Sequence, residues 1–189
     1  VVSRDDVVAV VGLNNGTQQQ PLLSYGFNSI AVGCRDGDHA SGDVPAPYEG
    51  SGRMRPDLVA PLFTTSESTA TVSAAVAMLV EQVRDAANAL HADGERPEVI
   101  KAVLMASATH NGIIGETWSN DAAVDGTDRG ITVRPIDATV GAGHVNVDQA
   151  HLLMSGGKQT GAASGTSAAS LAGWSLETLS PGEQRSWLF

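Results

Sequence analysis

Residues 58–77 read LVAPLFTTSESTATVSAAVA, and this stretch carries the clearest structural pattern of the chain. Residues 58–60 are apolar and predict a buried strand. After a short loop the chain becomes rich in alanine, and its apolar residues recur at helical spacing, which predicts a helix from Ser68 to about Leu90. The apolar positions of this helix are Val72, Val76, Leu79, Val80 and Val83. A strand that leads directly into a long helix is typical of an α/β fold.

Two further strands are predicted upstream of this unit. Residues 7–11 read VVAVV and residues 29–33 read SIAVG, so both are nearly continuous apolar runs. Strands of a parallel sheet read in this way because helices and loops cover both of their faces. We therefore expect these two segments to join residues 58–60 in a mostly parallel sheet.

Two more helices are predicted downstream. One begins at Pro97, a residue well suited to the first helical position, and runs to about residue 108. The other begins near Asn146, where Gln149 gives a capping-box pattern, and ends at Gly156. Together with the strands, these helices predict a three-layer α/β/α fold, followed by a short β-rich segment at the C-terminus.

The composition limits the classes of protein to which the chain can belong. Its 189 residues, 42% of them hydrophobic, fit one soluble globular domain with a sizeable core. The formal net charge of -10 argues against a nucleic-acid or anionic-membrane partner, and no apolar run approaches the length of a membrane span. The single cysteine, Cys34, excludes an intrachain disulfide and favours a buried thiol.

The chain divides into three parts by composition. Residues 1–154 hold the α/β pattern, residues 155–170 have the Gly, Ser, Ala and Thr content of a linker, and residues 171–189 predict a strand, a turn at residues 180–182 and a second strand. The chain enters a strand-like run almost at its first residue, Val1, and its last five residues read as an unfinished strand. We therefore expect the sequence to be a fragment of a longer protein.

Two serines are candidates for a nucleophile. Such a serine gains from the start of a helix, where free backbone N–H groups and the positive end of the helix dipole stabilise an oxyanion. Ser66 lies at the start of the predicted long helix, although an ordinary helix cap has the same signature. Ser167, in the run SGTSAAS, lies within the linker composition, and Gly173 and Pro181 follow too closely for a helix to form.

Six segments, in the same order, resemble those of the subtilisin-like serine peptidases. The resemblance extends over about residues 6 to 154. The segments are VVGLNNG (10–16, similar to AAGNxG), NSIAVG (28–33, NxIxVG), RPDLVAP (55–61, KPDLVAPG), TSESTATVSA (65–74, GTSxATPxVAG), PEVIKAVLM (97–105, the closing helix) and GAGHVN (141–146, GxGxVN).

The resemblance implies catalytic roles for two residues. Ser66 matches the nucleophile, which would form an acyl-enzyme with a polypeptide substrate. Asn14 matches the asparagine whose side-chain amide would act with the Ser66 N–H to bind the oxyanion. Asn15 is a competing assignment, because a shift of one residue would exchange the two asparagines.

The chain also departs from the family. No histidine precedes Asn14, so the catalytic aspartate and histidine are expected upstream, in the missing N-terminal half of the catalytic domain. The fragment alone is therefore expected to be inactive, and the alternative is a non-catalytic scaffold or peptide-binding module. Thr64 replaces the glycine of the nucleophile motif, and Glu67 puts a negative charge beside Ser66.

The remaining expectations concern cofactors and location. The acidic residues between 120 and 128 do not match a calcium-loop template and read as a solvated turn. No cofactor is expected, and a structural calcium ion stays open. The resemblance also implies a location outside the cell or in the cell envelope.

Overall fold

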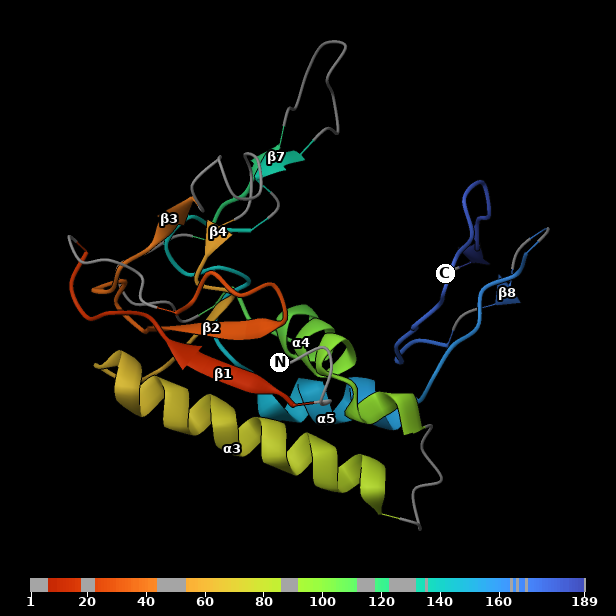
Figure 1. Ribbon diagram of the computed structural model, residues 1–189, viewed down its shortest axis with the longest axis horizontal. Coiled ribbons are helices and arrows are strands. Elements are labelled where there is room, and N and C mark those ends of the chain that lie inside the picture. Colours follow the sequence, from red (N-terminus) through yellow and green to blue (C-terminus); the bar gives the residue numbers. More distant parts are fainter. Residues whose placement is uncertain are drawn as a thin grey trace.

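A parallel sheet forms the centre of the protein. The computed structural model of the chain describes residues 7–17, 23–43, 54–85, 92–111, 118–122, 132–134, 136–163, 165, 167–168 and 170–188. The sheet has the order β1 (Ala9–Gly12), β2 (Ser29–Cys34) and β5 (Leu58–Ala60), and both pairings are parallel (Figure 1). The predicted strands are thus confirmed, and so is the α/β class. β1 lies at one edge of this sheet and is half-buried.

The helices begin close to the predicted residues. α4 (Pro97–Ala106) has proline at its first position, and α5 (Val147–Ser155) has Asn146 as its N-cap. α3 (Thr65–Arg84) begins before the predicted Ser68, and a short 3₁₀ helix, η1 (Ala92–Glu95), precedes α4. The side chain of Asn146 accepts a hydrogen bond from the Gln149 N–H at 3.1 Å, which confirms the predicted cap of α5.

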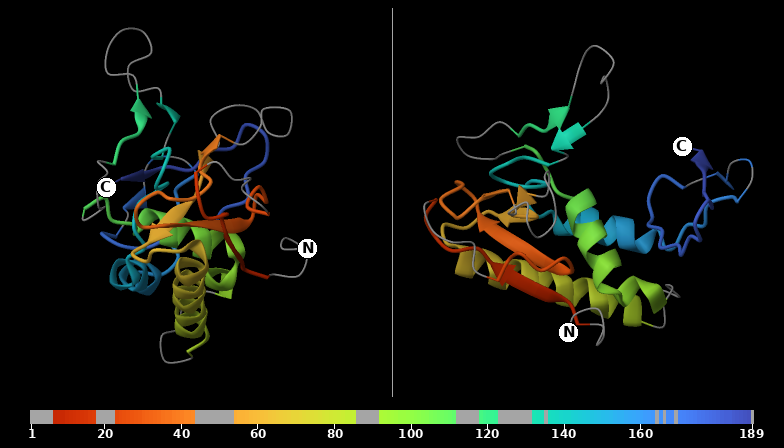
Figure 2. Two further views of the ribbon diagram at one scale, coloured as in Figure 1. Left: turned by 90° about the vertical axis from the view of Figure 1, so that its left-hand side faces the viewer. Right: turned by 45° about the horizontal axis from the view of Figure 1, so that its top comes forward.

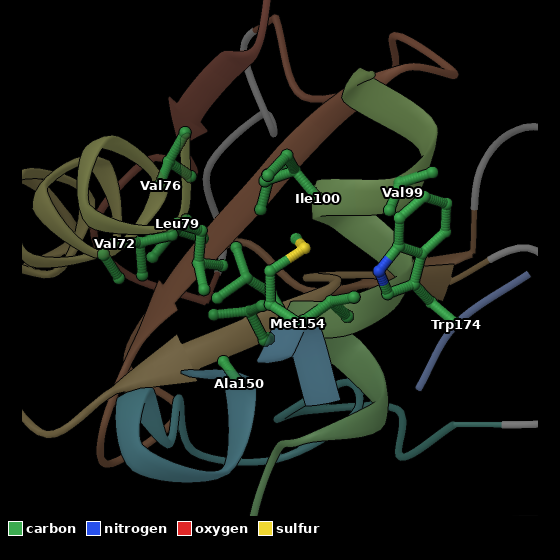
Figure 3. Packing of buried hydrophobic residues seen from close by; sticks show 14 of the residues in the cluster. Val72, Val76, Leu79, Val99, Ile100, Ala150, Met154 and Trp174 are labelled. Atoms are coloured by element: carbon green, nitrogen blue, oxygen red, sulfur yellow. The ribbon is translucent and has the colours of Figure 1, made fainter. Parts of the chain in front are cut away.

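The main hydrophobic core lies between the sheet and all three helices. Figure 3 shows side chains of α3, α4 and α5 converging there, among them Leu79, Ile100 and Met154. Ile30, Val32, Leu58 and Ala60 supply the sheet side of this core and are fully buried. On the opposite face, Val59 packs with Val140 and Trp118, which lie outside the helices. Among the described residues, loops rather than helices therefore form the third layer of the fold.

Further segments extend the sheet beyond β5. The Val59 N–H donates to the Gly143 carbonyl at 2.9 Å, and the Val145 N–H donates to the Val59 carbonyl at 2.8 Å. His144 then pairs with Thr109 on its other side. Antiparallel pairs form at β3 (Gly42–Asp43) with β4 (Met54–Arg55) and at β6 (Asp121–Ala122) with β7 (Thr132–Arg134).

The C-terminal segment has its own pairing and one anchor in the main core. Within the predicted linker, β8 (Ser167–Ala168) pairs in parallel with β9 (Trp187–Leu188). The predicted turn is confirmed, because the Glu183 N–H donates to the Ser180 carbonyl at 2.9 Å. Trp174 is 7% exposed and belongs to the main core, so part of residues 171–189 packs on the α/β unit (Figure 3).

Candidate functional site

Ser66 is the second residue of α3, and the cap of this helix sets its surroundings. Thr64 is the N-cap, with φ -121 and ψ 151, so this position is extended and does not require glycine. The Thr64 hydroxyl accepts from the Glu67 N–H at 3.3 Å and donates to the Glu67 carboxylate at 2.9 Å, a variant of the capping box in which the carboxylate accepts from the cap hydroxyl and not from the cap N–H. The Glu67 carboxylate is thereby held at the cap. This box also explains why α3 begins before the predicted start.

The N–H groups of the first turn of α3 have different partners. The Thr65 N–H donates to the Asn15 side-chain oxygen at 2.9 Å, and the Ser68 N–H donates to the Thr64 carbonyl at 3.0 Å. The Glu67 N–H is taken by the Thr64 hydroxyl. Ser66 is exposed, and neither its N–H nor its hydroxyl has a hydrogen-bond partner within the described parts of the chain. One donor of the helix N-terminus is therefore open, and it belongs to the candidate nucleophile.

Asn14, Asn15 and Ser66 line one pocket of about 360 Å³, with Gly12, Leu13, Thr65 and Thr69 as the other lining residues. The two asparagines follow β1 and Ser66 begins α3, so the tertiary fold brings these distant segments together. The pocket lies at the carboxyl end of the parallel strands, where ligands of open α/β sheets bind. The residues predicted from the resemblance thus lie in one place.

The two asparagines differ in how they are held. The Asn15 side-chain oxygen accepts from both the N–H and the hydroxyl of Thr65, at 2.9 and 3.1 Å, and Thr65 is 2% exposed. The amide group of Asn15 is therefore fixed against the start of α3. Asn14 is half-buried, and its backbone carbonyl accepts from the Ala40 N–H at 2.9 Å.

A glycine allows β1 and α3 to approach closely at this pocket. A Cβ atom at Gly12 would lie 2.6 Å from the Thr69 hydroxyl oxygen, which is too short for a non-bonded contact. That hydroxyl donates to the Thr65 carbonyl at 2.6 Å, so it cannot move away without losing this bond. Gly12 therefore lets the end of β1 place Asn14 and Asn15 beside Ser66.

None of the described histidines lines the Ser66 pocket. His39 is fully buried: its Nδ1 accepts from the Cys34 N–H at 3.1 Å, which leaves the proton on Nε2 for the Thr139 carbonyl at 2.8 Å. Both ring nitrogens are thus occupied, and burial lowers the pKa of His39. The neighbouring Cys34 is buried as expected, and burial raises the pKa of its thiol to about 12.

The other histidines lie elsewhere. His144 is 8% exposed, and burial lowers its pKa. His110 stacks on Trp118 with ring centroids 3.8 Å apart, and His151 is exposed on α5. His91 lies outside the described residues. No described imidazole is therefore in place to take a proton from Ser66.

The buried His39 makes stability depend on pH. Because its folded pKa lies below the ordinary 6.5, the unfolded chain takes up a proton first as the pH falls. We expect the free energy of unfolding, measured by urea denaturation, to decrease below pH 6.5. His39→Gln should reduce this pH dependence, with part of the remainder coming from His144. An unaltered slope in His39→Gln would contradict the assignment.

The other candidate features give no second site. In the described ranges, no group of three or more His, Cys, Asp or Glu side chains could hold a metal ion. Most of the acidic stretch at residues 120–128 lies outside those ranges. None of the described helices is long and apolar enough to span a membrane. Ser167 lies in β8, at the end of the molecule away from the start of α3 (Figures 1 and 2).

The fold and the pocket define an α/β domain with an exposed serine at the start of its longest helix. No family model matches the chain, and no curated protein matches it. It is similar to solved structures of protease domains. One is the self-cleaved protease domain of PatA, at 20% identity and a TM-score of 0.48. The match covers 82% of this chain and 53% of the PatA chain.

Two further structures of the same kind are similar to the chain. The patellamide maturation protease PatA has 23% identity and a TM-score of 0.48, covering 82% of this chain and 54% of its own. The prenylagaramide maturation protease PagA has 19% identity and a TM-score of 0.46, and the match covers 79% of this chain and 51% of the PagA chain. The chain thus spans about half the length of the structures that it matches.

Proposed function

We propose that the chain is the C-terminal portion of the catalytic domain of a subtilisin-like serine endopeptidase, with Ser66 as nucleophile. The observation that carries this proposal is that the N–H and hydroxyl of Ser66 have no partner among the described residues and lie at a pocket that two asparagines also line. An ordinary helix cap, the alternative for Ser66, is already supplied by Thr64. The motif resemblance and the position of the pocket at the carboxyl edge of the sheet also support it.

The proposed reaction uses this arrangement in a direct way. The Ser66 hydroxyl attacks the scissile carbonyl carbon of a polypeptide, and its proton passes to a histidine supplied by the upstream half of the domain. The carbonyl oxygen becomes an oxyanion and accepts hydrogen bonds from the Ser66 N–H and an asparagine amide. Because the base and its aspartate belong to the upstream half, this chain alone should be inactive.

The upstream half has a natural place to join. β1 is an edge strand of a parallel sheet, and no other described strand pairs with its outer side. Parallel sheets are normally covered on both faces, and sheets commonly have about four to six strands, so a further strand beside β1 would be usual. We propose that the upstream half continues the sheet at β1. An extracellular or cell-envelope location and the lack of a cofactor, with structural calcium left open, are parts of the same proposal.

The side-chain donor is either Asn14 or Asn15, and matched substitutions distinguish them. The motif assigns Asn14, whereas the contacts with Thr65 support Asn15, because they immobilise its amide. Asn15→Asp keeps an oxygen for Thr65 but removes the amide donors. We expect it to lower kcat of the intact natural protein by about 10²–10³-fold, measured with a peptide substrate.

Asn14→Asp is the control, because it adds the same charge to the same pocket. A larger loss in Asn14→Asp would return the role to Asn14. If neither variant lowers kcat while both melt like the wild type, the proposed oxyanion site is wrong.

The second candidate function is a non-catalytic scaffold or peptide-binding module. It is favoured by the positions of the described histidines, none of which lines the Ser66 pocket. Mass-spectrometric sequencing of the intact natural protein separates the two functions. An upstream segment with an aspartate and a histidine motif supports the peptidase, and a protein without them supports the scaffold.

A further inference from the structure

An arginine and an exposed phenylalanine lie together beside the start of α3. Arg35 directly follows β2, and Phe63 directly precedes the N-cap Thr64. The guanidinium carbon of Arg35 lies 3.9 Å from the centroid of the Phe63 ring, which is a cation–π contact. The Phe63 side chain is nevertheless 65% exposed, so the pair is accessible from solvent.

Backbone hydrogen bonds join this pair to the proposed catalytic pocket. The Arg35 N–H donates to the Leu62 carbonyl at 3.0 Å, which links the loop after β2 to the loop after β5. The loop after β2 also contacts the loop after β1, because the Ala40 N–H donates to the Asn14 carbonyl at 2.9 Å. All three loops therefore meet at the carboxyl edge of the sheet, with Ser66 among them.

Arg35 forms no ion pair in the part of the chain that the structure describes, although its charge helps to lower the pKa of the adjacent Asp36. The ion pairs there are made by Arg55, Arg84, Arg96, Lys101 and Lys158. The adjacent Asp36 carboxylate instead accepts from the Asp38 N–H and the Cys34 thiol. The Arg35 Nε is buried and has no hydrogen-bond partner among those residues. In a chain with a net charge of -10, this guanidinium lies on an aromatic ring and has no carboxylate bonded to it among the described residues.

We propose that Arg35, supported by Phe63, binds an acidic side chain of a polypeptide that lies along the carboxyl edge of the sheet past Ser66. This inference rests on the proposed function and assigns it a substrate class, polypeptides with a carboxylate close to the bond that is cut. A guanidinium binds a carboxylate through two parallel hydrogen bonds, and the Phe63 ring can contact the methylene groups of the bound side chain.

The chain length between Phe63 and Ser66 limits where that carboxylate lies. Three residues span at most about 10 Å, the length of about three residues of an extended substrate. The acidic residue should therefore lie within a few residues of the scissile bond.

Peptide binding tests this inference without requiring catalysis. Acetylated and amidated alanine hexapeptides, each carrying one glutamate, are titrated by calorimetry into the intact natural protein, with Ser66→Ala to prevent cleavage, and compared with the same series carrying glutamine. We expect the best glutamate peptide to bind about fivefold more tightly than its glutamine counterpart. Arg35→Gln should abolish this preference, and Arg35→Lys should retain part of it, because the charge remains but the planar fork is lost.

The control is Arg185→Gln, since Arg185 also lacks an ion pair among the described residues but lies in the C-terminal segment. It should keep the full preference. Equal binding of both peptide series, or a preference that survives in Arg35→Gln, would overturn the inference. A preference for glutamate in a natural protein that lacks the upstream motifs would disprove the peptidase and leave the acidic-peptide site standing.

Discussion

Replacing Ser66 by alanine in the intact natural protein is expected to abolish covalent labelling by a serine-directed phosphonate. The reagent phosphonylates a serine only where the hydroxyl is activated and the developing negative charge on oxygen is stabilised. Ser66 is exposed, its N–H is open, and it lines the pocket with Asn14 and Asn15. The measurement is the mass of the labelled protein and of its peptides after digestion.

Two other serines serve as controls for this experiment. Ser167→Ala should leave labelling intact, because β8 lies away from the start of α3 (Figure 1). Ser73→Ala should also leave it intact, because the Ser73 hydroxyl donates to the Thr69 carbonyl within α3 at 2.8 Å. Loss of labelling in Ser167→Ala with retention in Ser66→Ala would disprove the assignment of the nucleophile.

Asp57→Ala is expected to cause a large loss of stability. Asp57 is 2% exposed and accepts from Arg55 at 2.8 Å, from Lys101 at 2.9 Å and from the Ala31 N–H at 2.8 Å. Removing this carboxylate leaves Arg55, itself 2% exposed, as an uncompensated charge in the interior. Breaking a buried ion pair in this way costs about 3–5 kcal/mol of the free energy of unfolding.

The loss in Asp57→Ala can be measured by urea denaturation of the chain. The two partners of Asp57 also connect separate segments of the fold. Arg55 donates to the Gly26 carbonyl, and Lys101 of α4 donates to the Ser29 carbonyl at the start of β2. Glu98→Ala is the control, since its side chain and that of Arg96 are 37% and 48% exposed, and pairs near the surface contribute about 0–1 kcal/mol. Equal losses of unfolding free energy in the two variants would show that the buried cluster of Asp57, Arg55 and Lys101 stabilises the fold no more than the pair of Arg96 and Glu98 does.

Much of the fold follows from local patterns in the chain. Continuous apolar runs predicted β1, β2 and β5 as parallel strands, since only a sheet covered on both faces tolerates such runs. Local signals also located the beginnings of α4 and α5, because Pro97 and Asn146 act within one turn of the helix. The start of α3 was predicted too late because the Thr64–Glu67 capping box was not considered.

The arrangement of the site depended on contacts between distant segments. The sequence alone pointed to Ser66 and Asn14, and it kept Asn15 as a competing assignment for the role of Asn14. The contacts of Asn15 with Thr65 join segments 50 residues apart. They give the Thr65 N–H, at the start of α3, an acceptor that no local pattern in the sequence predicts. The stacking of Arg35 on Phe63 had no signal in the chain at all.

Secondary structure in this protein is thus determined by residues a few positions apart, because hydrophobic periodicity and helix caps act over single turns. Which N–H of α3 stays open, and which arginine stays unpaired, is decided only when the loops after β1, β2 and β5 meet. These loops meet because the parallel strands end at one edge of the sheet, and Gly12 lets β1 approach α3 closely enough to place Asn15 against Thr65.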